Sequence, residues 1–267
     1  MSLIKNHDCD YFAGIDIGSR TGKIAILDYA GNIIYSDITE TVKNAFSTYE
    51  KLISAVPLNI KNHIKSTVAT GYGRNAIESV VNQTLTEITA HYLGVKQFFP
   101  ETRTVIDIGG QDSKVIAVEN SVIRDFSMND RCAAGTGRFI EVMAERLGFS
   151  FDEIKALDVS TVEPVSINAT CTVFAESEVV SLMATDIDTK RIIASIAKMA
   201  ALNIFSMASK LHAKPPFVMT GGVSKLQPVL FFLEKFFETE IRVHQNSQIM
   251  GAIGAALSAK SHNDLIL

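Results

Sequence analysis

A segment near the start of the chain is repeated in the middle of it. Residues 11–29 read YFAGIDIGSRTGKIAILDY, and residues 104–118 read TVIDIGGQDSKVIAV. Each copy has an apolar run ending in Asp-Ile-Gly, a few small or polar residues that include a lysine, and a second apolar run. A turn then leads to a third run, at 33–38 and at 122–126. Each copy predicts three strands joined by short turns, and the recurrence indicates an internal duplication.

The duplication determines the domain organisation that we expect. The chain has 267 residues, 47% of them hydrophobic and 20% charged, which is enough for two well-packed α/β lobes. We expect an N-terminal lobe over residues 1–102, closed by a helix at 84–99 with Pro100 after it. A second lobe is expected over residues 103–247, and a C-terminal helix over residues 248–267 is expected to pack back on the first lobe.

The loop Gly18–Lys23, after the first Asp-Ile-Gly, predicts a phosphate-binding site. It offers backbone N–H groups, the hydroxyls of Ser19 and Thr21, and the ammonium of Lys23. Glycines let a backbone approach phosphate oxygens closely, and a lysine supplies compensating charge. The loop is not a Walker A motif, which would need Ser or Thr at Ile24. For this segment alone, an ordinary hairpin loop is the alternative.

Two such loops facing one cleft can hold a polyphosphate from both sides. The carboxylates of Asp16 and Asp107 would then reach a hydrated Mg²⁺, which prefers one or two carboxylates together with phosphate oxygens and water. Gln111 and Asp112 follow the glycine pair of the second loop, where they are placed to orient or deprotonate the attacking water. Lys23 would stabilise charge on the transferring phosphoryl group.

A third glycine turn completes the predicted nucleotide site. Residues 216–224, PFVMTGGVS, predict a buried strand, a Gly-Gly turn and a helix from Lys225 onward. Such a turn lets the backbone approach adenine and ribose. Gln248, just before the C-terminal helix, is a further candidate, although a surface position fits it equally well. The residues that we expect at the nucleotide or its Mg²⁺ are Asp16, Gly18, Ser19, Arg20, Thr21, Gly22, Lys23, Asp107, Gly109, Gly110, Gly135, Gly221, Gly222, Lys225 and Gln248.

The chain has three cysteines, Cys9, Cys132 and Cys171. An odd number without a Cys-x-x-Cys pair argues against a disulfide framework, so a buried apolar thiol and a metal ligand remain as alternatives. Cys132 precedes a helix whose apolar face carries Phe139, Ile140, Met143 and Leu147. A helix N-terminus has unpaired N–H groups that favour negative charge nearby. Cys171 likewise precedes a helical stretch, at 174–183, whereas Cys9 lies in a polar tail and is expected to be uninvolved.

Charge and hydropathy exclude several classes of function. The formal net charge is −4 and no Lys or Arg run forms a basic stripe, which argues against nucleic-acid binding. The N-terminus has no apolar signal segment, and the apolar stretch 192–211 is interrupted by Lys198 and Asn203. Neither secretion nor a membrane span is therefore expected, and we predict a cytoplasmic protein.

Several motifs together resemble one protein family over nearly the whole of residues 11–260. They are A-T-G-Y-G-R-N (69–75), T-V-I-D-I-G-G-Q-D-S-K (104–114), N-D-R-C-A-A-G-T-G-R-F (129–139), T-C-T-V-F-A-E-S-E-V (170–179), V-M-T-G-G-V (218–223) and M-G-A-I-G-A-A-L (250–257). The set resembles the ATP-dependent activators of 2-hydroxyacyl-CoA dehydratases, a family that includes the ATPase subunits of benzoyl-CoA reductase. These proteins belong to the actin, Hsp70 and sugar-kinase superfamily. The resemblance implies a duplicated actin-like (ribonuclease H-like) ATPase fold with a nucleotide cleft between two lobes.

The resemblance also implies an ATPase coupled to electron transfer. It implies a homodimer that holds one [4Fe-4S] cluster between its subunits, with Cys132 and Cys171 of each chain as ligands. ATP hydrolysis would drive single low-potential electrons from a ferredoxin or flavodoxin into an iron–sulfur dehydratase. This chain departs from the family in having Gly22 where a small hydroxyl residue usually precedes the lysine, which leaves Ser19 and Thr21 as the candidate hydroxyls.

Other functions compete with this interpretation. Within the family, the acceptor could instead be benzoyl-CoA reductase or a double-cubane reductase. A small-molecule kinase of the same superfamily, or a nucleotide-dependent binding module, would explain the glycine motifs but would leave both cysteine motifs without a role.

Overall fold

The computed structural model describes residues 10–130, 135–167 and 172–266, with the backbone alone at 172–175 and 264–266. Cys9, Cys132 and Cys171 lie outside the described residues. The chain divides into two compact units. The first contains residues 1–100 and 248–267, and the second contains residues 101–247.

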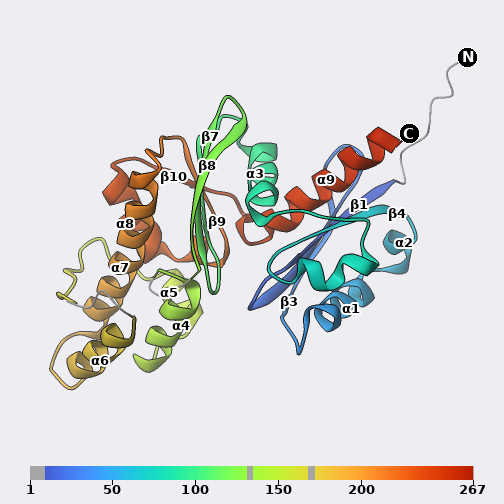
Figure 1. Ribbon diagram of the computed structural model, residues 1–267. Coiled ribbons are helices and arrows are strands. Elements are labelled where there is room, and N and C mark those ends of the chain that lie inside the picture. The colour runs from blue at the N-terminus through green and yellow to red at the C-terminus, as the bar shows by residue number, and fades with distance from the viewer. Residues whose placement is uncertain (1–9, 131–134, 168–171, 267) are drawn as a thin grey trace, which may run out of the picture. The chain divides into compact units, whose positions relative to one another are not determined.

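The first unit is built on a five-stranded mixed sheet (Figure 1). The strand order is β3-β2-β1-β4-β5. β1 pairs antiparallel with β2, and β2 with β3, while β1 pairs parallel with β4, and β4 with β5. The strands are β1 (Tyr11–Ile17), β2 (Thr21–Leu27), β3 (Ile33–Glu40), β4 (Ile64–Thr70) and β5 (Gln83–Thr84).

The sheet of the second unit has the same topology. Its order is β8-β7-β6-β9-β10, with the same antiparallel and parallel pairs at the same places. Asp16 lies opposite Lys23 in the first sheet, and Asp107 lies opposite Lys114 in the second. The predicted duplication is therefore confirmed, and it extends to the fourth and fifth strands. The strands are β6 (Thr104–Ile108), β7 (Ser113–Glu119), β8 (Val122–Asn129), β9 (Phe217–Thr220) and β10 (Ile241–Val243).

The two faces of the first sheet are covered by different helices. Ala13, Ile15 and Ile17 of β1 belong to a core that includes Leu52 of α1. Successive residues of a strand point to opposite faces, so Phe12, Gly14 and Asp16 lie on the other face, where α9 packs. The helical elements of this unit are α1 (Ala45–Ala55), α2 (Leu58–Lys61), the 3-10 helix η1 (Arg74–Val80), α3 (Glu87–Phe98) and α9 (Met250–Ile266).

Glycines allow the backbone of α9 to approach the backbones of β1 and α3 closely. A Cβ at Gly14 would lie 1.9 Å from the carbonyl oxygen of Ala252, and a Cβ at Gly254 would lie 1.8 Å from that of Ala90. Neither neighbour is a flexible side chain, so any larger residue must push the helix away. This explains why small residues predominate in the first half of the C-terminal helix.

Gly254→Ala is expected to destabilise the first unit by about 2–3 kcal/mol, the upper part of the range for an overpacked core. The added methyl must separate α9 from α3, because the obstacle is a backbone carbonyl. Chemical denaturation would measure the loss. Ser258→Ala, at a half-buried position of the same helix, is the matched control and should change the midpoint little. An unchanged midpoint for Gly254→Ala would contradict the close approach of the two helices.

The described helices of the second unit pack around one apolar core. Phe139, Ile140, Met143 and Leu147 are all buried in it, which confirms the apolar face predicted after Cys132. α7 packs against α4, α6, α8 and β7. The helical elements are α4 (Gly137–Arg146), α5 (Phe151–Lys155), α6 (Thr172–Met183), α7 (Thr189–Lys210), the 3-10 helix η2 (Gly222–Lys225) and α8 (Gln227–Phe237); a third 3-10 helix, η3 (Ser247–Ile249), joins the units.

Among the described residues, α7 is the one helix long and apolar enough to cross a membrane, with a mean hydropathy of 1.5. In this fold 61% of its most apolar 18-residue stretch is buried inside the protein. Its buried side chains belong to the core of the second unit. The apolar character of α7 is thus accounted for by packing within that unit.

Two predicted helix starts were wrong. The helix expected at 84–99 starts at Glu87, because Gln83–Thr84 pairs with β4 and the Thr86 side chain caps the helix. The helix expected from Lys225 starts at Gln227, after η2 has ended.

Candidate functional site

The turn after the first Asp-Ile-Gly is tighter than the sequence suggested. The N–H of Gly18 donates to the carbonyl oxygen of Thr21 over 3.1 Å, and β2 already begins at Thr21. Thr21, Gly22 and Lys23 are therefore strand residues rather than loop residues, since Gly22 pairs with Ile17 and Lys23 with Asp16. The loop itself is reduced to residues 18–20, of which Arg20 is exposed and Ser19 half-buried. Strand geometry, not loop geometry, determines where the Lys23 side chain points.

Gly22 faces the side of the sheet that α1 covers. A Cβ at this position would lie 2.4 Å from Cγ2 of Thr48 on α1. Because side chains alternate along a strand, Thr21 and Lys23 point to the opposite face. A hydroxyl at position 22 would meet α1. Ser19 and Thr21 remain the candidate hydroxyls for a phosphate in this chain.

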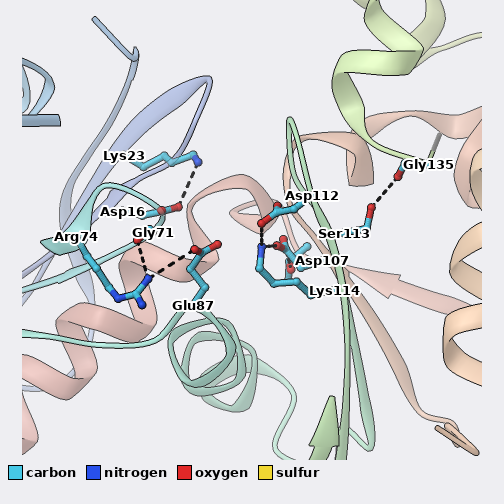
Figure 2. A network of polar contacts seen from close by, with 11 residues as sticks. Asp16, Lys23, Gly71, Arg74, Glu87, Asp107, Asp112, Ser113, Lys114 and Gly135 are labelled. Carbon is cyan, nitrogen blue, oxygen red and sulfur yellow. Dashed lines mark hydrogen bonds and ion pairs between the residues drawn. The ribbon is translucent and has the colours of Figure 1, made fainter. Parts of the chain in front are cut away.

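Asp16 and Lys23 form an ion pair with an Nζ–Oδ2 distance of 3.2 Å (Figure 2). Gly71, at the end of β4, covers the carboxylate closely. Its φ is +91°, and a Cβ there would lie 2.5 Å from Oδ1 of Asp16. Arg74 Nη1 donates to the carbonyl oxygen of Gly71 over 3.0 Å and lies 4.0 Å from Oε1 of Glu87. Arg74 thus holds in place the turn that borders Asp16.

The corresponding cluster of the second unit is more deeply buried. Lys114 Nζ lies 2.7 Å from Oδ2 of Asp112 and 3.5 Å from Oδ2 of Asp107, and its side chain is 2% exposed. The hydroxyl of Thr220 donates to Oδ1 of Asp107 over 3.0 Å. Lys114 and Thr220 were not predicted as site residues. The repeated lysine in the two Asp-Ile-Gly segments was the signal that could have identified Lys114.

The two candidates for orienting water differ in their surroundings. The carboxylate of Asp112 is held by Lys114, and a Cβ at Gly109 would lie 2.7 Å from its Oδ1. Gln111 is exposed at the tip of the same loop. Of the two side chains, that of Gln111 is therefore the more accessible to a solvent molecule.

Three motifs that are far apart in the sequence meet at the start of α4. The N–H of Gly137 donates to the carbonyl oxygen of Gly109 over 2.9 Å, and the N–H of Arg138 donates to that of Gly110 over 2.8 Å. A Cβ at Gly137 would lie 3.1 Å from Cγ2 of Val223, in the Gly-Gly turn region after β9. The second Asp-Ile-Gly loop is thus joined directly to the helix that follows Cys132.

These contacts correct one expectation. The first N–H groups of α4 were expected to be unpaired and to favour negative charge at Cys132, but those of Gly137 and Arg138 already donate to carbonyl oxygens. Gly135, with φ +97°, is also anchored, because its carbonyl oxygen accepts from the Ser113 hydroxyl over 2.7 Å (Figure 2). A Cβ there would lie 3.2 Å from Cβ of Asn203 on α7, so this glycine has a packing role.

The turn after β9 is held by serines. Gly221 has φ +85°, and its N–H donates to the carbonyl oxygen of Ser247 over 3.0 Å. The Ser224 hydroxyl contacts the Gly221 carbonyl oxygen at 2.7 Å and the Ser247 hydroxyl at 2.8 Å. Lys225 follows. Partial desolvation of its ammonium and, to a smaller extent, the charge of Lys155 lower the pKa of Lys225 from 10.5. Gly222 and Gln248 are both half-buried.

The carboxylates expected to bind Mg²⁺, Asp16 and Asp107, lie at the same position of the two sheets and in different units. Within the described residues, no group of three or more His, Cys, Asp or Glu side chains is arranged to hold a metal ion. A hydrated Mg²⁺ bound through phosphate oxygens needs no such group.

The chain matches a known protein family over most of its length. The model of the BadF/BadG/BcrA/BcrD ATPase family matches residues 13–259. The chain belongs to this ATPase family. It is 40% identical over 252 residues to the (R)-2-hydroxyglutaryl-CoA dehydratase activating ATPase of Acidaminococcus fermentans, covering 93% of this chain and 96% of that one. The resemblance inferred from the motifs is thereby confirmed, and with it the expectation of an ATPase.

Solved structures of the BadF/BadG/BcrA/BcrD family agree with the fold. The component A structure from Acidaminococcus fermentans matches with a TM-score of 0.90 and 39% identity, over 96% of this chain and 99% of that one. The activator of 2-hydroxyisocaproyl-CoA dehydratase from Clostridium difficile, with bound ADPNP, matches with a TM-score of 0.88 and 36% identity, over 96% of each chain. A ROK family glucokinase from Streptomyces griseus, at 15% identity and a TM-score of 0.63, shares the fold alone, over 94% of this chain and 99% of that one. The predicted duplicated α/β fold of the actin-like and sugar-kinase type is confirmed.

Proposed function

We propose that this chain is an ATP-dependent activator that passes single low-potential electrons to an iron–sulfur 2-hydroxyacyl-CoA dehydratase or a related reductase. The names of its relatives support the activator role. The observation that carries the proposal is the pair of hydrogen bonds from Gly137 and Arg138 to the carbonyl oxygens of Gly109 and Gly110. They join a predicted phosphate loop to the helix that follows a predicted cluster cysteine.

On the nucleotide side, Lys23 and the two aspartates, Asp16 and Asp107, have different tasks. Lys23 would move from Asp16 to the phosphates, and Asp16 and Asp107 would hold the waters of Mg²⁺. Gln111, more accessible than Asp112, would orient the attacking water. Gly18, Ser19, Arg20 and Thr21 of the first unit, and Gly109 and Gly110 of the second, would contact the phosphates. Gly221, Gly222, Lys225 and Gln248 would contact the adenosine.

On the electron side, Cys132 and Cys171 supply two thiolates from each chain. A two-fold homodimer would bring four thiolates together, the set that a [4Fe-4S] cluster needs. When bound, the cluster supplies one-electron chemistry at low potential. A ferredoxin or flavodoxin in the cytoplasm would be the donor, and the acceptor would be the iron–sulfur centre of the partner enzyme.

Coupling between the two sides would run through α4. Phosphate binding that moves the second Asp-Ile-Gly loop must move the first turn of α4, because two backbone hydrogen bonds connect them and Gly137 leaves almost no gap. The segment containing Cys132 immediately precedes that turn. Hydrogen-bond donation and water access around a cluster help to determine its potential, and driving one electron through 100 mV takes about 2.3 kcal/mol.

Anaerobic purification tests the proposal. The protein should be a brown dimer with about four irons per dimer, and on reduction it should transfer electrons to a purified dehydratase only while ATP is hydrolysed. The brown colour should fade in air. A colourless, iron-free protein with full ATPase activity would overturn the electron-transfer role.

Lys23→Met is expected to lower kcat for ATP hydrolysis by about 100-fold or more, because one preorganised charge at the transferring group contributes on this scale. Steady-state phosphate release would measure the effect. Lys65→Met removes an exposed lysine of the same unit, which pairs with Asp10, and should leave kcat unchanged. Equal kcat values for wild type and Lys23→Met would exclude Lys23 from the site.

A further inference from the structure

The Asp-Lys clusters of the two units occupy the same strand positions but are completed differently. In the second unit Asp107 lies opposite Thr220, whose hydroxyl donates to the carboxylate over 3.0 Å. In the first unit Asp16 lies opposite Thr70 in the same parallel register. The duplication thus places a threonine opposite each of the two equivalent carboxylates.

Thr70 is the exception among these groups. Its side chain is 0% exposed, and its hydroxyl oxygen has no hydrogen-bond partner among the described protein atoms. Val68, two residues earlier on β4, packs with Ala255 and Ala259 of α9, so Thr70 points to the face where Asp16 lies. A buried hydroxyl without a partner is unfavourable and therefore calls for an explanation.

The two lysines are also held differently. Lys114 is bound by two carboxylates and is 2% exposed. Lys23 is bound by Asp16 and is 14% exposed, and Thr21 occupies the position that Asp112 has in the other unit. Lys23 can therefore leave its carboxylate more readily than Lys114 can. When it does, Asp16 loses its charged partner and needs a replacement.

We propose that Thr70 is a positioning residue that donates to Asp16 when Lys23 turns to the phosphates. The hydroxyl would then do for Asp16 what Thr220 does for Asp107, and hold the carboxylate in place for the hydrated Mg²⁺. The proposal rests on the nucleotide site of the proposed function. On this proposal, the Thr70 hydroxyl gains its hydrogen-bond partner when the nucleotide is bound.

Thr70→Val tests this, because valine keeps the shape and removes the donor. Without nucleotide, Thr70→Val should be as thermally stable as wild type or more so, whereas the matched control Thr220→Val should melt at a lower temperature. With Mg²⁺-ADPNP, the thermal shift of Thr70→Val should be smaller than that of wild type. In turnover, its KM for MgATP should rise about tenfold at similar kcat, the scale of one hydrogen bond to a charged group. Thr70→Ser, which restores the donor, should restore KM.

The outcomes separate this inference from the function on which it rests. If wild type itself shows no thermal shift with Mg²⁺-ADPNP, the nucleotide site is wrong. If wild type responds and Thr70→Val matches it in shift and KM, the role of Thr70 is wrong and the site stands. If Thr70→Val without nucleotide loses as much stability as Thr220→Val, Thr70 is already bonded in the resting protein and the inference is again overturned.

Discussion

Replacing Cys132 or Cys171 with serine is expected to abolish both the iron–sulfur cluster and ATP-dependent electron transfer. In the proposed dimer each substitution removes two of four ligands, because the two-fold axis doubles it. A serine hydroxyl does not replace a soft thiolate at iron. Iron and acid-labile sulfide content would measure the loss, together with the visible absorption of protein prepared without oxygen.

The third cysteine provides the control. Cys9→Ser alters a thiol in the polar N-terminal tail and should leave cluster content and electron transfer unchanged. All three variants should keep the thermal shift with Mg²⁺-ADPNP, since the phosphate loops are intact. Full iron content in Cys132→Ser or Cys171→Ser would contradict the assignment of that cysteine as a ligand.

Lys114→Met is expected to destabilise the second unit by about 3–5 kcal/mol, the usual loss when one partner of a buried ion pair is removed. Methionine fills much of the same volume but leaves the Asp107 and Asp112 carboxylates without their ammonium, and Asp107 is buried. Denaturant unfolding followed by circular dichroism would measure the change.

Lys23→Met is the matched control for stability, since Lys23 has the same strand position but is more exposed and pairs with a single carboxylate. It should lose less stability and more activity. Wild-type stability in Lys114→Met would show that the Lys114 ammonium does not hold the second Asp-Ile-Gly loop together.

The sheets were predictable because each duplicated segment has the same order of apolar runs and turn residues. Asp16 and Asp107 identify equivalent strand ends, and the apolar runs on each side predicted the first three strands of each unit. The equivalence of Thr70 and Thr220 was missed. The connection between the third and fourth strands covers residues 41–63 in one unit and 130–216 in the other, so a short Thr-Gly match is hidden by very different helical insertions.

Other site features depended on contacts that have no sequence pattern. Thr21 to Lys23 read as a loop because small and polar residues favour turns, but pairing with β1 draws them into a strand. The role of Arg74 depends on the Gly71 carbonyl and on Glu87, which a local motif does not reveal. Likewise, only the tertiary fold brings the Gly109 and Gly110 carbonyls to α4.

The bonds from α4 to the second Asp-Ile-Gly loop also orient the peptide groups of that loop. The carbonyl oxygens of Gly109 and Gly110 both face the helix. In a planar trans peptide the N–H points opposite to the C=O, so the N–H groups of Gly110 and Gln111 face away from α4. Two peptide dipoles thus have their positive ends on the side away from α4, where we propose that the phosphates bind, and the hydrogen bonds from α4 fix that orientation.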